Sequence, residues 1–140
     1  MLDVSLFDTD PGWAHLHNAA LHGINSLLVY ALLLKISGSW WKACVLSLIF
    51  LVHPLHVESV AWIAERKDLL CALFFLLGIL LYDNYRARPG KLRYALVVIS
   101  FILALLAKPM AVTFTVVILI LDFFVYSERF ERSIGKVRSI

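Results

Sequence analysis

Long apolar runs broken by short polar clusters organise this chain of 140 residues. A helix needs about 20 residues to cross roughly 30 Å of hydrocarbon, because it rises about 1.5 Å per residue. The pattern therefore predicts an all-α, polytopic integral membrane protein with about five transmembrane helices. We expect the crossings near residues 15–35, 40–54, 68–85, 92–107 and 110–126.

The last apolar stretch, residues 92–126, decides this count. As one helix its 35 residues would reach about 50 Å, which exceeds any bilayer even when the helix tilts. Lys108-Pro109 interrupts the stretch. Lysine at mid-membrane is costly, and the residue before a proline disfavours helical geometry. We therefore expect a hairpin that turns at Lys108-Pro109, with a short crossing on each side.

The composition supports a membrane protein. Hydrophobic residues make up 61% of the chain, charged residues make up 16%, and the mean hydropathy is +0.85. Soluble domains carry about 25% charged residues, so this chain has too few charges to cover a globule. Cys44 and Cys71 lie in apolar runs and are interpreted as small buried hydrophobes, not as a disulfide or metal pair. We expect membrane lipid, and no nucleic acid, as a partner.

The distribution of charge gives the orientation. With five crossings, ten of the thirteen cationic residues fall on one side, and only Arg66, Lys67 and Lys108 fall on the other. The positive-inside rule makes the first side cytoplasmic, so the basic tail 127–140 and the carboxyl terminus are expected there. Residues 53–68 and the Lys108 turn then share the outer or luminal face. The amino terminus lies on that face too, so we expect a further membrane segment upstream of Met1.

The stretch HPLHVESVAWIAERKD, residues 53–68, places seven ionisable groups inside an otherwise apolar chain. Pro54 removes a backbone donor, so the second helix should end or kink there. Residues 55–66 have helical periodicity, with Glu58, Trp62 and Glu65 on one stripe. They predict a short interfacial helix with Trp62 at the level of the lipid headgroups.

Two interpretations of this stretch remain open. In the first, its charges only contact water and lipid headgroups. In the second, Glu58 acts as an acid, base or ligand beside His53 and His56, while nearby charged side chains bind a lipid-linked phosphate. The predicted lipid-phosphate or substrate site consists of Arg66, Lys67, Asp68 and Lys108. Snorkelling of Lys108 to the membrane surface is the structural alternative.

Metal binding is a further alternative for His53, His56 and Glu58. Their spacing differs from the HExxH zinc pattern, and no cysteine or second cluster completes a ligand set. Histidines near the outer end of the first crossing could instead ligate a haem, although histidines at such positions are more often hydrogen-bonded or interfacial: His15, His17 and His22.

Acidic residues elsewhere favour structural roles. Asp8 and Asp10 spell the D-x-D of many cation-dependent sugar transferases, but Pro11-Gly12 follows and makes a turn the simpler interpretation. Asp83 and Asp122 lie near the cytoplasmic ends of their helices, where we expect them to pair with basic residues. No cofactor is expected, and a divalent metal has only weak support.

The motif HPLHVESVAWIAERKDLL, followed by a membrane helix, a basic loop and LLAKPMAVTFTVVILILDF, resembles the transmembrane-and-tetratricopeptide-repeat O-mannosyltransferases and their bacterial relatives. The opening LDVSLFDTDPGWAHLHNAALHGIN resembles the segment that precedes this motif in those proteins. The similarity covers residues 2–126, and its H-P-x-H-x-E-x-V-x-W run is not a general membrane pattern.

The resemblance implies that residues 1–126 form part of a GT-C-like membrane domain. Such an enzyme transfers a sugar from a polyprenyl-phosphate carrier to a protein or glycan acceptor, on the outer or luminal face of the bacterial inner membrane or endoplasmic reticulum membrane. By this analogy Glu58, His53 and His56 would lie at the catalytic cleft. Lys108 would lie near the lipid phosphate.

The chain also departs from that family. Members begin with another membrane helix and an outer loop that carries acidic catalytic residues, and they continue into further helices and usually tetratricopeptide repeats. The present sequence starts after that loop, so whether it is an enzyme is left open. The alternatives are a non-catalytic membrane scaffold or degenerate remnant, and a small transporter. Transport is disfavoured because most charges lie at helix ends.

Overall fold

The computed structural model describes residues 11–53 and 66–126, and within these ranges the ordered elements are all helical. This confirms the predicted all-α class. The elements are α2 (Pro11–Ser37), α3 (Trp40–Val52), α5 (Arg66–Ala87), α6 (Lys91–Ala107), the 3-10 turn η2 (Pro109–Val112), α7 (Thr113–Ile120) and the π-helical turn η3 (Leu121–Tyr126). The expected interfacial helix 55–66 and the basic tail 127–140 lie outside the described residues, except for Arg66, which begins α5.

The helix ends follow from particular residues. Gly38 adopts a positive φ of 65°, and its N–H donates to the carbonyl of Leu34 at 2.9 Å, which terminates α2. This is the left-handed cap that glycine forms most easily. His53 and Lys108 are both extended, with ψ of 128° and 127°, and each precedes a proline. Proline thus ends α3 and α6 by its effect on the preceding residue, and the expected hairpin at Lys108 is present.

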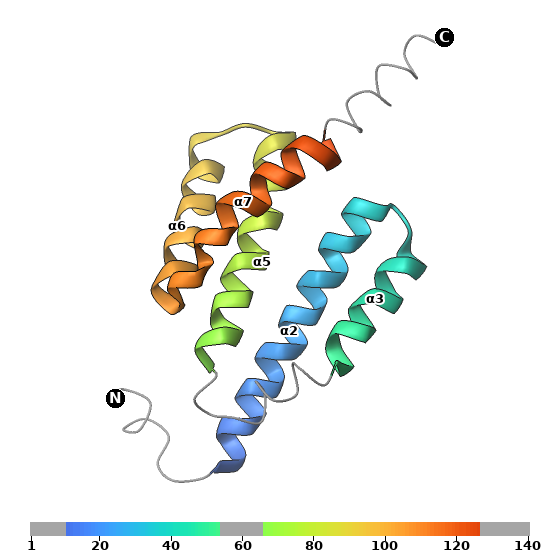
Figure 1. Ribbon diagram of the computed structural model, residues 1–140, viewed down its shortest axis with the longest axis vertical. Helices are drawn as coiled ribbons and strands as arrows, with labels where there is room; N and C mark the ends of the chain where they lie inside the picture. The colour runs from blue at the N-terminus through green and yellow to red at the C-terminus, as the bar shows by residue number, and fades with distance from the viewer. Residues whose placement is uncertain (1–10, 54–65, 127–140) are drawn as a thin grey trace.

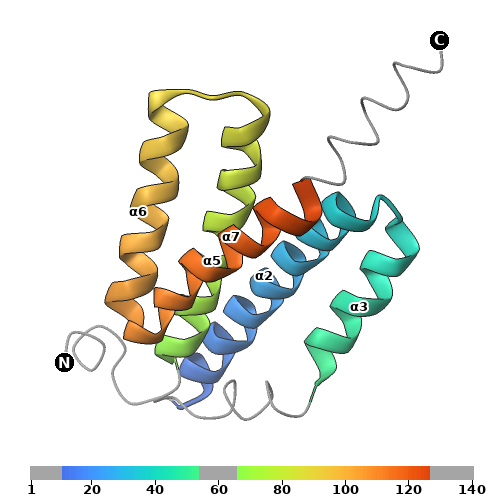
Figure 2. The ribbon, with the colours of Figure 1, turned by 45° about the horizontal axis from the view of Figure 1, so that its top comes forward.

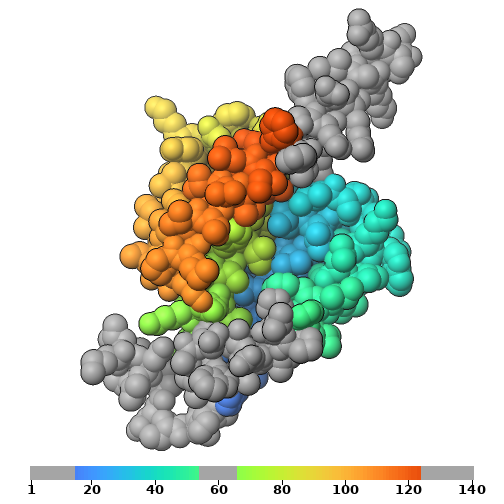
Figure 3. Space-filling view, in the orientation of Figure 1, coloured from blue at the N-terminus to red at the C-terminus, as the bar shows by residue number. Residues whose placement is uncertain are grey.

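Two antiparallel helix pairs build the bundle, and its two central helices run parallel. The helices α2 and α5 lie side by side at its centre, α3 packs on α2, and α6 packs on α5 (Figure 1). The helix α7 runs obliquely across α5, as Figure 2 shows. The space-filling view shows α6 and α7 on one side and α3 on the other, with α2 and α5 visible between them (Figure 3).

The apolar core lies where α5, α6 and α7 meet. Ile79, Val97 and Phe114 are buried there. The Phe114 ring lies 5.2 Å from the ring of Phe75 on α5 and 5.2 Å from that of Phe101 on α6. Gly78 makes this close approach possible, because a Cβ at that position would lie 2.8 Å from Cζ of Phe114.

Two described helical segments are long and apolar enough to cross a membrane: His15–Ser37 and Arg66–Ala87. The apolar helices Trp40–Val52 and Pro109–Phe123 are shorter. At 13 residues, α3 reaches only about 20 Å. Large apolar side chains nevertheless lie exposed on α2, α3, α6 and α7, as expected of helices that face lipid or further protein. The count of five crossings and the GT-C architecture stay predictions.

Candidate functional site

Three helix termini lie at one end of the bundle, here named the Lys108 end. Successive helices alternate in direction, so the end of α3, the start of α5 and the end of α6 lie at the same end (Figures 1 and 2). Five of the seven predicted site residues occupy these termini: His53, Arg66, Lys67, Asp68 and Lys108. His56 and Glu58 lie outside the described residues.

Lys108 and Asp68 form an ion pair across this end. The Lys108 ammonium donates to both carboxylate oxygens of Asp68, each at 2.7 Å, although the two residues are 40 positions apart in the chain. Their side chains keep 38% and 36% of their accessible surface. The pair is therefore open to solvent or to a ligand on one side.

Helix geometry explains why this pair forms. Asp68 lies in the first turn of α5, where the partial positive charge of the helix favours a carboxylate. Lys108 is the C-cap residue of α6, where the partial negative charge favours a cation. Because α5 and α6 pack antiparallel, these two termini are adjacent. Each helix dipole thus stabilises one charge, and the ion pair joins the two helices.

Cations outnumber carboxylates among the described residues of this site. Arg66 is partly exposed and Lys67 is exposed, and both lie within two positions of Asp68. With Lys108 they give this end of the bundle three cations and one carboxylate among its described residues. An arrangement of this kind can bind a phosphate through charge-assisted hydrogen bonds. His53 is exposed at the end of α3.

The remaining part of the predicted site is not described. Glu58 and His56 fall in residues 54–65, so their roles as acid, base or ligand stay predictions. Within residues 11–53 and 66–126, no group of three His, Cys, Asp or Glu side chains is placed to hold a metal ion. The zinc alternative involves residues beyond those ranges and is not addressed by this finding.

A buried polar stripe on α2 was not predicted from the sequence. It consists of Asn18, His22, Asn25 and Ser26, each less than 10% exposed. Their spacing of four, seven and eight residues places them on one face of the helix. Polar groups on a single face of an apolar helix favour contacts with other helices, and this signal in the sequence could have revealed them.

Two side chains of this stripe contact the helix termini that flank residues 54–65. The Nε2 atom of His22 lies 3.0 Å from the carbonyl oxygen of Leu51, in the last turn of α3. Such carbonyls lack partners within their own helix. The amide of Asn25, less than one turn further along α2, donates to the carbonyl of Leu69 in the first turn of α5 at 3.0 Å. The helix α2 therefore holds both neighbouring termini.

The opposite end of the bundle, here named the Lys35 end, contains two further charge pairs. Lys35 donates to Asp83 at 2.9 Å and to Asn84 at 3.1 Å. Asp122 accepts hydrogen bonds from Arg86 and from the hydroxyl of Tyr82. These contacts confirm the expectation that Asp83 and Asp122 pair with basic residues.

With this geometry in hand, sequence relatives decide the family. Human Protein O-mannosyl-transferase TMTC1 is 31% identical over 143 residues, which is 94% of this chain and 16% of that protein. Mouse Protein O-mannosyl-transferase TMTC4 is 38% identical over 90 residues, covering 55% of the chain and 12% of that protein. Human Protein O-mannosyl-transferase TMTC3 is 29% identical over 115 residues, covering 80% of this chain and 12% of that protein.

The chain belongs to the TMTC family. This confirms the resemblance found in the HPLHVESVAWIAERKDLL motif, whereas a relationship to bacterial proteins stays a prediction. The chain spans about a sixth of the length of human TMTC1, or 16%. No family model matches it, and no solved structure matches it.

Proposed function

We propose that this TMTC homologue contributes to a membrane glycosyltransferase that transfers mannose to a protein acceptor. The donor would be a sugar on a polyprenyl-phosphate carrier, and the reaction would take place on the luminal face of the endoplasmic reticulum membrane. Two apolar helices of spanning length and the names of the relatives support this proposal. The fold would be the membrane domain of a GT-C enzyme.

The observation that carries the proposal is the position of Lys108. Its ammonium binds Asp68 in the first turn of α5, the turn that also contains Arg66 and Lys67, at the end of the bundle where the motif begins and ends. A carrier phosphate at this end would meet three cations. An anion of this kind could share the Lys108 ammonium with Asp68, since an ammonium has three donors.

The proposed mechanism divides the chemistry between two groups. The carboxylate of Glu58 accepts the proton of the acceptor hydroxyl as its oxygen bonds to the anomeric carbon. The bond from that carbon to the phosphate oxygen breaks, and the phosphate leaves with the bonding electrons. Lys108, Arg66 and Lys67 stabilise the negative charge that develops on the leaving phosphate. His53 and His56 are proposed to flank Glu58.

A non-catalytic scaffold is the second candidate, and one observation favours it. Both oxygens of Asp68 accept hydrogen bonds from the Lys108 ammonium, and in a scaffold this contact would serve to join α5 and α6. In that case loss of Lys108 changes stability and leaves sugar transfer unaffected.

The test compares variants of the chain in a protein with measurable transfer. The chain replaces the matching segment of human TMTC1, and mannose transfer from a synthetic polyprenyl-phosphate mannose to a peptide is measured in microsomes. Glu58→Gln should lower kcat/KM by at least about a hundredfold, in the range found for general bases. Lys108→Ala should lower it at least about tenfold, while Lys108→Arg should retain most of it.

Lys42→Ala is the matched control, because Lys42 is an exposed lysine at the first turn of α3, remote in sequence from the motif. Its transfer rate should equal that of the unsubstituted chimaera. Unchanged transfer rates in both Glu58→Gln and Lys108→Ala, at equal expression, would remove these residues from the mechanism. The non-catalytic scaffold would then be the remaining candidate function.

A further inference from the structure

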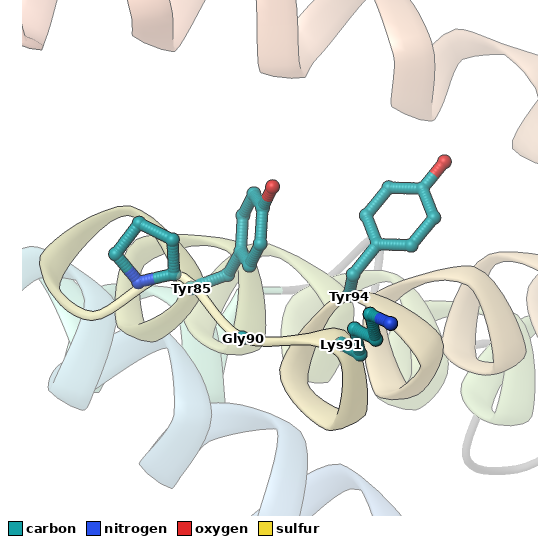
Figure 4. A pocket seen from close by; sticks show the side chains of 5 residues that line it. Tyr85, Gly90, Lys91 and Tyr94 are labelled. Carbon is teal, nitrogen blue, oxygen red and sulfur yellow. The ribbon is translucent and has the colours of Figure 1, made fainter.

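A pocket lies at the Lys35 end, where α5 passes into α6. It has a volume of about 510 Å³ and is lined by Tyr85, Pro89, Gly90, Lys91 and Tyr94 (Figure 4). This volume lies within the range of small-molecule binding sites. Because Lys108 and Asp68 are at the other end of α5 and α6, the pocket is separate from the candidate transferase site.

Two tyrosines form the walls of the pocket. Tyr85 in the last turns of α5 and Tyr94 in the first turn of α6 have ring centroids 5.8 Å apart, with an angle of 53° between the rings. Figure 4 shows both rings standing on the same side of the turn, with their hydroxyl groups directed away from the backbone and Lys91 beside them. The ring centroids of Tyr85 and Tyr82 lie 6.5 Å apart. Tyrosine with an exposed hydroxyl is typical of the membrane interface.

The charges around the pocket are not balanced within the described residues. Arg86 pairs with Asp122, and Arg93 donates to the backbone carbonyl of Arg88. In residues 11–53 and 66–126, the side chains of Arg88 and Lys91 form no ion pair with a carboxylate. Lys91 lines the pocket, and Arg88 directly precedes the lining residue Pro89 in the chain; both are exposed, and two such cations favour an anionic ligand.

An apolar strip continues from the pocket along α6. Ala95, Val98 and Ile102 follow Lys91 at four, seven and eleven residues, so they share one face of the helix. All three are at least partly exposed. A soluble phosphate has no apolar part that could contact this strip, whereas a lipid would place its headgroup at Lys91 and an acyl chain along the strip.

We propose that this pocket binds the phosphate headgroup of an anionic membrane phospholipid. Lys91 and Arg88 contact the phosphate, the hydroxyls of Tyr85 and Tyr94 donate hydrogen bonds to it, and one acyl chain lies along α6. Basic pockets at the ends of membrane helices recognise such headgroups. The proposal requires that the helices reside in a membrane, but it does not depend on sugar transfer.

The test measures lipid retained by the purified chain. The protein is reconstituted in nanodiscs of phosphatidylcholine with or without phosphatidylserine, and lipid retained after extraction is measured by native mass spectrometry. The unsubstituted chain should retain phosphatidylserine in preference to phosphatidylcholine. The double variant Arg88→Ala, Lys91→Ala should lower this retention at least about tenfold. Lys91→Arg should preserve it, because the charge remains.

Lys42→Ala provides the matched control for charge. Lys42 is an exposed lysine at the Lys35 end, but it belongs to α3, which lies on the opposite side of the bundle from α6 (Figure 2). Its removal should leave retention within about twofold of the unsubstituted value, because a distant exposed charge is screened. Folding of every variant is checked by circular dichroism, and the exposed positions of Arg88 and Lys91 predict native spectra.

Three results would overturn the proposal. Equal loss in Lys42→Ala and in the double variant would show general attraction between charges and the membrane. Equal retention of phosphatidylcholine would show that the phosphate charge is not recognised. Displacement of bound phosphatidylserine by inorganic phosphate would show a site for a free anion. None of these results bears on mannose transfer, so the two proposals fail separately.

Discussion

The two ends of the bundle use ion pairs in different ways. At the Lys35 end, each described carboxylate has a cation and a second polar contact in the same group: Asn84 shares Lys35 with Asp83, and Tyr82 donates to Asp122. At the Lys108 end, Asp68 is the one described carboxylate; it pairs with Lys108, and Arg66 and Lys67 precede it in the first turn of α5. Each pair at the Lys35 end thus includes a neutral polar side chain, whereas both oxygens of Asp68 accept from the single ammonium of Lys108.

This difference separates structural charge from charge that is available to a ligand. An ion pair between adjacent helices stabilises their packing, and its cation has fewer N–H donors available for an anion. Cations at the membrane surface can donate charge-assisted hydrogen bonds to a lipid phosphate. The contrast supports a mainly structural role for the pairs of Asp83 and Asp122, and the lipid pocket proposed at the same end uses Arg88 and Lys91, which belong to neither pair.

The largest change in stability is expected from substitution of Gly78, which lies on α5 between the two ends. In Gly78→Ala the new Cβ would lie 2.8 Å from Cζ of Phe114, a ring already enclosed by Phe75 and Phe101. Because the ring cannot move freely, α5 and α7 must separate. We expect the free energy of unfolding to fall by about 1–3 kcal/mol, as for other overpacked cores. Denaturant unfolding in detergent micelles measures this change.

Gly23→Ala is the control for this substitution. A Cβ at Gly23 would have no atom within 4 Å, and the residue lies inside α2. Alanine is the better helix former, so this variant should gain about 0.5–1 kcal/mol. Equal destabilisation by both variants would contradict the close approach of Phe114 to α5.

A smaller loss of stability is expected from substitution of His22, and it should be confined to the Lys108 end. In His22→Ala the carbonyl of Leu51 loses a hydrogen bond to a side chain that is 6% exposed. The loss of one such bond should cost about 1 kcal/mol. We expect faster hydrogen exchange of the backbone amides in the last turn of α3, with unchanged exchange at the Lys35 end.

His22→Gln tests whether hydrogen bonding is the cause, because glutamine keeps a donor on a side chain of similar length. Exchange near Leu51 should return toward the unsubstituted rate. If exchange rises equally at both ends in His22→Ala, His22 supports the whole bundle and does not specifically hold the terminus of α3.

The sequence predicted elements better than it predicted contacts between them. Hydrophobic runs located the helices, and the backbone effect of proline located the ends at His53 and Lys108. These are local effects, so one chain position is enough to detect them. The pairing of Asp83 and Asp122 with basic residues followed from their place at helix ends.

Contacts that join distant helices were not predictable in this way. Lys108 and Asp68 were each assigned to the site, but their direct pairing depends on how α5 and α6 align, which periodicity does not specify. The partners of His22 and Asn25 are carbonyls of Leu51 and Leu69 on other helices, which the spacing within α2 does not specify. The face of a helix can be read from spacing, but the neighbour that covers it is set by packing.

The smallest effect is expected from matched changes of the two carboxylates. Asp122→Asn weakens the interactions with Arg86 and Tyr82, and since the ion pair is partly exposed, the loss should be about 1 kcal/mol of unfolding free energy. Asp68→Asn loses a similarly exposed pair with no tyrosine partner, so its loss should be below about 1 kcal/mol.

The two variants should differ more in their binding of a lipid phosphate than in stability. Because Asp68→Asn removes the only described carboxylate that competes for Lys108, the affinity for a synthetic polyprenyl phosphate should rise by up to about fivefold. Asp122→Asn should leave that affinity unchanged, and an equal rise in both variants would show that the effect does not come from the contact between Asp68 and Lys108.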